Sequence, residues 1–240
     1  MQRVSRVKMP VYQELKPEIL SDNGLNLLHV FNISALPHSI IDSLGLQQSK
    51  YQQLILVGHG GRKLWNFLPQ TRPHPENRID DFSQATITNW LNTAHPTLNY
   101  ELVYPLSQTI NLITLGQLAG WHHESPFKVG INSQWGTWFA YRAVILANSQ
   151  FKVSPPFEPP SPCTSCQHKP CISHCPAGAC ESGSLNINTC INYRKQAESN
   201  CMNTCHARLS CPVQQKHRYT DAQLDYHYTE SLKIINQFKL

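Results

Sequence analysis

The sequence predicts a mixed α/β domain over residues 1–150 followed by a smaller cysteine-rich domain over residues 163–218. Segments with strand character alternate with segments of helical character in the first part, which is typical of α/β domains. All nine cysteines lie in the second part, between Cys163 and Cys211. The stretch 154–162 has five prolines, so residues 151–162 are expected to form a stiff, extended linker.

Each element of the first part is predicted from apolar spacing. Strands are expected where apolar and β-branched residues run together, at 25–34, 54–61, 99–105 and 138–147. Helices are expected where apolar residues recur at helical spacing or where glycine or proline bounds a short segment, at 11–24, 37–46, 47–51, 63–68, 81–91 and 107–121. The chain closes with a predicted amphipathic helix in 219–240, which begins at Asp221.

The cysteine spacing points to iron–sulfur chemistry. From Cys163 to Pro176 the chain reads C-x2-C-x4-C-x3-C-P, close to the bacterial ferredoxin run C-x2-C-x2-C-x3-C-P. In that run three cysteines hold one [4Fe–4S] cluster and the fourth ligates a second cluster. A second Cys-Pro pair, Cys211-Pro212, ends a looser second set. Because proline suits the first turn of a helix, we expect a helix to begin after Cys175.

By this logic the chain holds two [4Fe–4S] clusters, with Cys180 left over. Cluster A would be bound by Cys163, Cys166, Cys171 and Cys211, and cluster B by Cys175, Cys190, Cys201 and Cys205. Three alternatives stay open: a single cluster, a structural zinc site built from the C-x2-C pair with other cysteines or His206, and a disulfide framework. The repeated Cys-Pro ending favours clusters, since zinc sites need no such ending.

Two stretches of the first domain could bind a ligand or a metal in addition to their structural role. The glycine-rich run Gly58-His59-Gly60-Gly61 follows a predicted strand, where α/β proteins often bind ligands. It matches neither G-x-G-x-x-G nor a P-loop, so a plain strand-to-helix turn is favoured over a phosphate cradle. Trp121-His122-His123-Glu124 contains metal-binding residue types. Adjacent side chains on a helix diverge, so surface or cofactor-facing histidines are favoured over a metal site.

Composition narrows the classes of partner. The net charge is +5, and residues 163–218 carry six basic against two acidic side chains. This excess is expected to balance the negative charge of bound clusters rather than to form a nucleic-acid surface, which needs a clustered basic stripe. No run of about eighteen apolar residues is present, so no membrane span is expected. Cysteines meant for iron suit a reducing compartment, and a cytoplasmic location is expected.

The second half of the sequence, about 105–240, resembles the epoxyqueuosine reductases. The residues that carry the resemblance are Gly120-Trp121, the stretch 129–139 with Trp135 and Trp138, and the cysteine block with Cys190-Ile191-Asn192-Tyr193. The stretch 138–145 and the segment from Arg218 to Tyr226 are also similar to cobalamin-processing proteins of the CblC type. The overall layout is similar to small bacterial ferredoxin-like proteins.

The resemblance implies a nitroreductase-like or CblC-like α/β domain followed by a two-cluster ferredoxin-like domain. It implies a cobalamin or a flavin lying against Trp138, Tyr141 and Arg142, although packing of these three residues in the core strand is the favoured alternative. It also implies an electron donor of the flavodoxin or ferredoxin type. Epoxyqueuosine reductases carry a catalytic Asp before the Gly-Trp stretch, whereas 104–110 here contains no carboxylate. The expectation is therefore an electron-passing protein. The alternatives are a cobalamin-dependent reductase of another substrate and a zinc-stabilised binding module.

Overall fold

The computed structural model describes residues 12–46, 50–69, 77–106, 110–155 and 158–237. Its centre is a sheet of four strands in the order β1-β2-β4-β3, and every neighbouring pair is antiparallel. The strands are β1 (Leu27–Asn32), β2 (Gln53–Gly60), β3 (Tyr100–Tyr104) and β4 (Phe139–Ala147). The predicted strands are all present, so the mixed α/β class is confirmed, with antiparallel pairing throughout.

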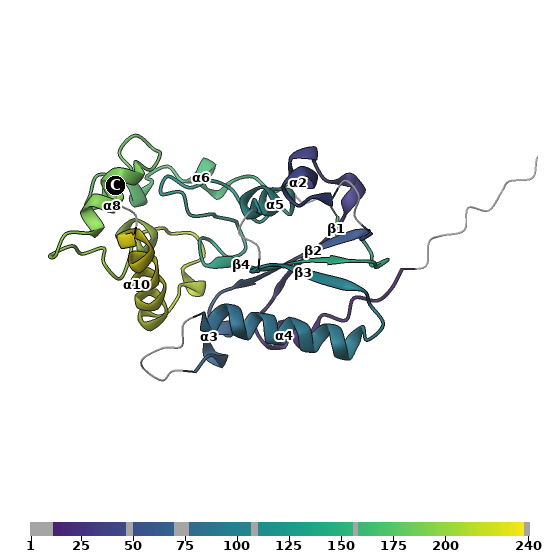
Figure 1. Ribbon diagram of the computed structural model, residues 1–240. Coiled ribbons are helices and arrows are strands. Elements are labelled where there is room, and N and C mark those ends of the chain that lie inside the picture. The colour runs from purple at the N-terminus through teal and green to yellow at the C-terminus, as the bar shows by residue number, and fades with distance from the viewer. Residues whose placement is uncertain (1–11, 47–49, 70–76, 107–109, 156–157, 238–240) are drawn as a thin grey trace, which may run out of the picture.

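Helices cover both faces of the sheet, as Figure 1 shows. One face carries α1 (Glu18–Asp22), α3 (Lys63–Phe67) and α4 (Arg78–Ala94), and the other carries α2 (His38–Ser43) and α5 (Leu112–Leu118). On α4 the buried residues Ile79, Ser83, Ile87 and Trp90 recur at helical spacing, which turns one side of the helix toward the sheet. Strand β2 is buried along its whole length.

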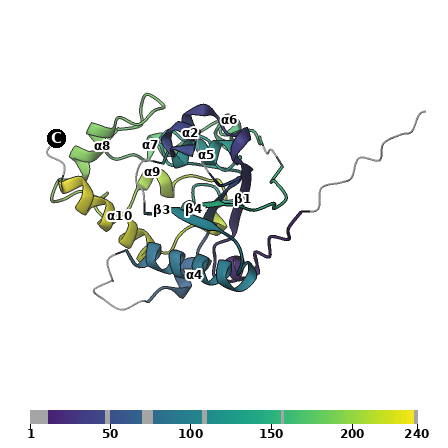
Figure 2. The same cartoon turned by 45° about the vertical axis from the view of Figure 1, so that its right-hand side comes forward.

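The cysteine-rich part contains only short helices. They are α6 (Pro162–Ser165), α7 (Pro170–Ser173), α8 (Ile187–Arg194) and α9 (His206–Leu209), followed by a 3-10 turn at Gln215–His217. Another 3-10 turn, Ile33–Ala35, follows β1 in the sheet domain. The last helix, α10 (Asp221–Gln237), lies beside the cysteine-rich part at one end of the sheet (Figures 1 and 2). Tyr226 of α10 joins the core that α4 forms with the sheet.

Several predicted elements differ in extent from the structure. The predicted strand at 25–34 is shorter and continues into a 3-10 turn. In the predicted helix 47–51, residues 47–49 lie outside the described residues and Tyr51 is not helical. The predicted helix 107–121 is α5, while 107–109 lie outside the described residues. Phe151, the first residue of the predicted linker, is buried in the core of the sheet domain.

The helix predicted after Cys175-Pro176 is wrong. The chain instead makes consecutive turns there, and the short helix α7 precedes Cys175 and begins at Pro170. Gly178 has a φ of +63°, a left-handed conformation that ends helical continuation. Pro176 therefore lies in a turn. None of the helices in the described ranges has the length and hydropathy needed to cross a bilayer.

Candidate metal centres

The first group of thiols gathers where α6 and α7 meet the segment after α9. We call Cys163, Cys166, Cys171 and Cys211 group A. Burial, together with the nearby thiols of Cys211, Cys163 and Cys166, raises the pKa of Cys171 to about 11. Burial, then Cys211 and Cys166, also raises the pKa of Cys163. Residues almost fifty positions apart in sequence are thus electrostatic neighbours.

Local backbone features hold group A in place. Pro162 and Pro170 begin α6 and α7, where a missing N–H is tolerated. Between the two helices Lys169 adopts a left-handed conformation with a φ of +37°, which turns the chain back. The side chain of Ser161 caps α6 by accepting a hydrogen bond from the Cys163 N–H at 3.3 Å. The short segments between the cysteines therefore form tight turns that keep the group A thiols near one another.

The second group of thiols comes from four segments. We call Cys175, Cys190, Cys201 and Cys205 group B. The pKa of Cys201 is raised to about 11, mainly by burial; the His206 N–H acts in the opposite direction, and the Cys205, Cys175 and Cys190 thiols add to the rise. Burial and then Cys205 raise the pKa of Cys190, with Arg194 acting in the opposite direction.

Cys180 lies between the two groups. It is 1% exposed, and burial raises its pKa to about 12. The further contributions come from Cys175, which is also its hydrogen-bond partner, from Cys205 and from Cys171. Cys175 and Cys205 belong to group B and Cys171 to group A. The cysteine that the spacing left over is therefore a buried thiol in contact with both sets.

The group B thiols line an apolar cavity of about 350 Å³. All four of them, together with Cys180, face it. Arg194, which is 7% exposed, also lines it and donates hydrogen bonds to the carbonyl oxygens of Cys201 at 3.0 Å and Tyr228 at 2.8 Å. The cavity is therefore walled by sulfur, hydrocarbon and one buried cation.

The alternatives to iron–sulfur clusters can be compared with this arrangement. All nine cysteines are free thiols, so no disulfide framework is present. Within the described ranges, no three His, Cys, Asp or Glu side chains are gathered closely enough to hold a single metal ion. His206, the histidine considered as a zinc ligand, has its Nε2 3.1 Å from the carbonyl oxygen of Asn200.

The three residues expected to contact a cobalamin or flavin do not share one surface. Trp138 is fully buried, with the Arg208 guanidinium 4.5 Å from its ring. Tyr141 packs on the α5 face of the sheet, where its hydroxyl lies 3.0 Å from Nδ1 of His122. Arg142 points to the α4 face. The three side chains therefore differ in burial and in neighbours, and their role as cofactor contacts remains a prediction.

A β-bulge explains where Arg142 points. Val57 of β2 faces Ala143, whereas Gly58 faces Tyr141, so Arg142 is an extra residue in β4. Such an insertion bends the strand and redirects side chains, and bulges are common beside functional sites. Here Arg142 shares the α4 face with Ala143 and lies with its Nη1 3.5 Å from the Asp80 carboxylate.

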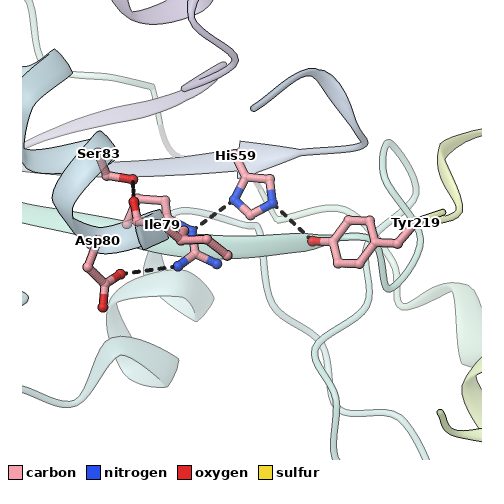
Figure 3. A network of polar contacts seen from close by, with 6 residues as sticks. His59, Ile79, Asp80, Ser83 and Tyr219 are labelled. Carbon is pink, nitrogen blue, oxygen red and sulfur yellow. Dashed lines mark hydrogen bonds and ion pairs between the residues drawn. The ribbon is translucent and has the colours of Figure 1, made fainter. Parts of the chain in front are cut away.

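The bulge places Arg142 against His59, the centre of a buried polar network that the sequence did not predict. The Nε–H of Arg142 donates to Nδ1 of His59 at 2.9 Å, and Nε2 of His59 lies 3.1 Å from the Tyr219 hydroxyl. Figure 3 shows His59 between Tyr219 and the end of α4 that carries Asp80. Since an arginine can only donate, Nδ1 accepts and the Nε2–H donates to Tyr219. Burial and then Arg142 lower the pKa of His59 well below its ordinary value, so it is neutral.

The network continues to the group B thiols. Arg208 donates to the Tyr219 hydroxyl and to Tyr228, and it also donates to the carbonyl oxygen of Thr137. Tyr228 is in turn hydrogen-bonded to Cys205. Polar contacts thus join the sheet to a predicted cluster ligand.

The glycine-rich run ends β2, and the two adjacent histidines lie after α5 in a stretch that is not helical, where His122 is buried rather than on the surface. Gly58, His59 and Gly60 belong to β2, and only Gly61, with a φ of +75°, makes the turn. A Cβ on Gly60 would lie 2.2 Å from the Trp135 ring, so this glycine gives the indole room. Glu124 forms an exposed ion pair with Lys128 at 2.5 Å. The glycine-rich run therefore ends a strand and turns the chain toward α3, in agreement with the strand-to-helix turn that the sequence favoured over a phosphate cradle.

Comparison with solved structures shows the same mixed α/β fold in two kinds of enzyme. An epoxyqueuosine reductase from Bacillus subtilis aligns with a TM-score of 0.55 and 14% identity, covering 86% of this chain and 67% of that chain. An epoxyqueuosine reductase solved with a tRNA stem loop gives a TM-score of 0.55 and 13% identity, covering 87% and 68%.

A reductive dehalogenase, studied for B12-dependent dehalogenation, gives a TM-score of 0.50 and 12% identity; the match covers 91% of this chain and 34% of that chain. The chain therefore spans about a third of that dehalogenase. No protein-family model matches the chain, and no curated protein matches it either. The expected resemblance to epoxyqueuosine reductases is thus present at the level of the fold.

Proposed function

We propose that this chain is an iron–sulfur redox protein that holds one [4Fe–4S] cluster on group A and one on group B. In this proposal residues 163–218 form the cluster-binding part, and single electrons pass from it toward the sheet domain. The observation that carries the proposal is the division of the thiols. Apart from Cys180, which neighbours both groups, the cysteines that raise one another's pKa belong to the same group, and this supports two sets of four ligands of the ferredoxin type.

The surroundings of both groups fit a bound cluster. A cluster with four thiolates is negatively charged, and cations lie beside both groups. Burial raises the pKa values of Cys163, Cys211 and Cys190, and the nearby Lys169, Arg218 and Arg194, respectively, act in the opposite direction. Backbone N–H groups of His206 and Val213 donate to Cys201 and Cys211. The group B thiols also line a cavity of about 350 Å³. These features support a thiolate-bound anion in each place.

The clusters supply one-electron transfer, and the chain's residues hold and tune them. Raised thiol pKa values mean that ligation must displace protons, so metal binding and deprotonation occur together. The Tyr228 hydroxyl and Arg194 act on group B by hydrogen bonding and by charge. The donor would be a flavodoxin- or ferredoxin-type protein.

Anaerobic potentiometric titration tests this proposal. We expect a broad visible absorption that bleaches on reduction in two separate one-electron steps. Zinc bound without acid-labile sulfide would overturn the proposal and favour the zinc-stabilised binding module instead.

A second candidate is a cobalamin-dependent reductase. It is favoured by the fold shared with epoxyqueuosine reductases and with a reductive dehalogenase. Against it, Trp138, Tyr141 and Arg142 face different surroundings. Cobalt bound in equal amount to protein would favour this candidate. A tRNA partner, as in one similar structure, would be recognised by RNA binding that weakens steeply with salt.

A further inference from the structure

A second cavity, of about 270 Å³, lies between the sheet and α10. It adjoins the cavity lined by the group B thiols, because Val129, Tyr228 and Ser231 line both. Its other polar lining residues are Arg142, Arg208, Tyr219 and His227. Its volume is close to the lower limit of about 300 Å³ typical of ligand sites, so it suits a small molecule.

The charged side chains that line this cavity are all positive. Two guanidinium groups line it, and no Asp or Glu does. Arg142 has a carboxylate nearby, with its Nη1 3.5 Å from Asp80. Arg208 is 8% exposed, and among the described residues no carboxylate lies within ion-pair distance of it. A buried charge without a counter-charge is costly.

The proposed cluster does not take up this charge directly. The cation that faces the group B cavity is Arg194, whereas Arg208 lines only the second cavity. Arg208 is held in place by Tyr219, whose ring lies 5.0 Å from the guanidinium, and by Trp138 at 4.5 Å. Its guanidinium is therefore fixed at the wall of the second cavity by aromatic rings and by neutral oxygens.

Two residues that line the cavity each have a buried nitrogen atom with no hydrogen-bond partner among the described residues. These atoms are Nε2 of His227 and Nε of Arg208. Buried nitrogen atoms are almost always hydrogen-bonded, so an unpaired one calls for an explanation such as a ligand. Burial, then Arg142, Arg208 and Arg78, lowers the pKa of His227 to about 3. His227 is therefore a neutral imidazole able to donate one hydrogen bond, set in a field of cations.

We propose that this cavity binds a small anion with a carboxylate or phosphate oxygen group, which Arg208 and Arg142 hold by charge and His227 by a hydrogen bond. The inference rests on the proposed function and deepens it, because the cavity adjoins the proposed cluster B and the anion would be the ligand reached by its electrons. Binding itself requires no electron transfer, so it can be measured at a fixed oxidation state.

The test is saturable binding to the anaerobically purified full chain, measured by calorimetry with propionate, inorganic phosphate and the neutral propionamide. We expect one of the two anions to bind and propionamide to bind at least tenfold more weakly. Arg208→Gln should weaken binding of that anion by about ten- to a hundredfold, the effect expected from losing a charge-assisted hydrogen bond. Arg62→Gln, an exposed arginine, is the matched control and should bind as the wild type does.

His227→Leu is the second variant, because it removes the unpaired donor without removing a charge, and it should weaken binding about tenfold. Iron content is measured on every sample. Absence of saturable binding by either anion to iron-loaded protein overturns the anion site while leaving the proposed function in place. Equal binding of propionate and propionamide, or unchanged binding in both variants, also overturns it. Anion binding by a chain that contains zinc in place of iron removes the proposed function and retains the cavity assignment.

Discussion

Replacement of Tyr219 by phenylalanine tests the buried network between the sheet and the C-terminal segment. The hydroxyl of Tyr219 is the partner of His59 at 3.1 Å and also of Arg208. Removing it leaves the Nε2–H of His59 without an acceptor in a site where His59 is 1% exposed. A buried donor left unsatisfied costs about 1–3 kcal/mol. For a protein of this length, 2 kcal/mol corresponds to a fall of about 4–8 °C in Tm.

The assay is thermal unfolding under anaerobic conditions, with iron content matched between samples. Tyr12→Phe is the control, since Tyr12 is exposed and its change should alter stability by less than about 0.5 kcal/mol. The double variant His59→Leu with Tyr219→Phe should lose less stability than the sum of the two single variants, because the Nε2–H of His59 that Tyr219→Phe leaves without an acceptor is then absent. If Tyr219→Phe melts within 1 °C or so of the wild type, the network contributes nothing to stability and the reasoning fails.

Three further outcomes are expected. Tyr228→Phe should lower the midpoint potential of one cluster by about 40 mV. A hydrogen bond that stabilises the reduced cluster by about 1 kcal/mol more than the oxidised cluster gives that shift for one electron. An unchanged potential would show that the hydroxyl does not tune the cluster. Cys190→Ser should halve the iron content while Cys180→Ala leaves it intact, and equal losses in both would refute the assignment of ligands. Burial lowers the pKa of His29 from 6.5 to about 4, so the unfolded chain binds this proton first, and the part of the stability that comes from neutral His29 should fall by up to about 1.4 kcal/mol per pH unit as pH drops from 6.5 to 4. His29→Phe should reduce that slope in thermal melts, whereas Phe67→Leu, in α3 on the opposite face of the sheet, should shift Tm equally at every pH.

The elements that could be predicted from sequence are those set by local pattern. The four strands and α4 follow from apolar spacing that needs no knowledge of partners. The pairing order β1-β2-β4-β3 depends on long-range contacts, and no local pattern encodes it. The predicted helix after Pro176 failed because the proline signal was weighed without Gly178, whose left-handed φ ends the segment.

In the candidate site, too, the residues set by local sequence could be predicted, and those set by long-range contacts could not. Cysteine spacing predicted two sets of thiols because three ligands come from one short loop, and the electrostatic neighbours of Cys171 and Cys201 follow the same division. His59 and Arg208 were missed because they become partners only through the bulge at Arg142 and the docking of Tyr219. The one available signal was a histidine between glycines at the end of an apolar strand. That signal is too common to single out a buried network.

The central claim is that eight of the nine cysteines hold two iron–sulfur clusters, and one measurement addresses it most directly. Iron, acid-labile sulfide, zinc and cobalt are counted on a single anaerobic preparation of the full chain. The account predicts about eight iron and eight sulfide per chain, the content of two [4Fe–4S] clusters, with no stoichiometric zinc. A colourless protein that contains zinc and no sulfide would contradict it.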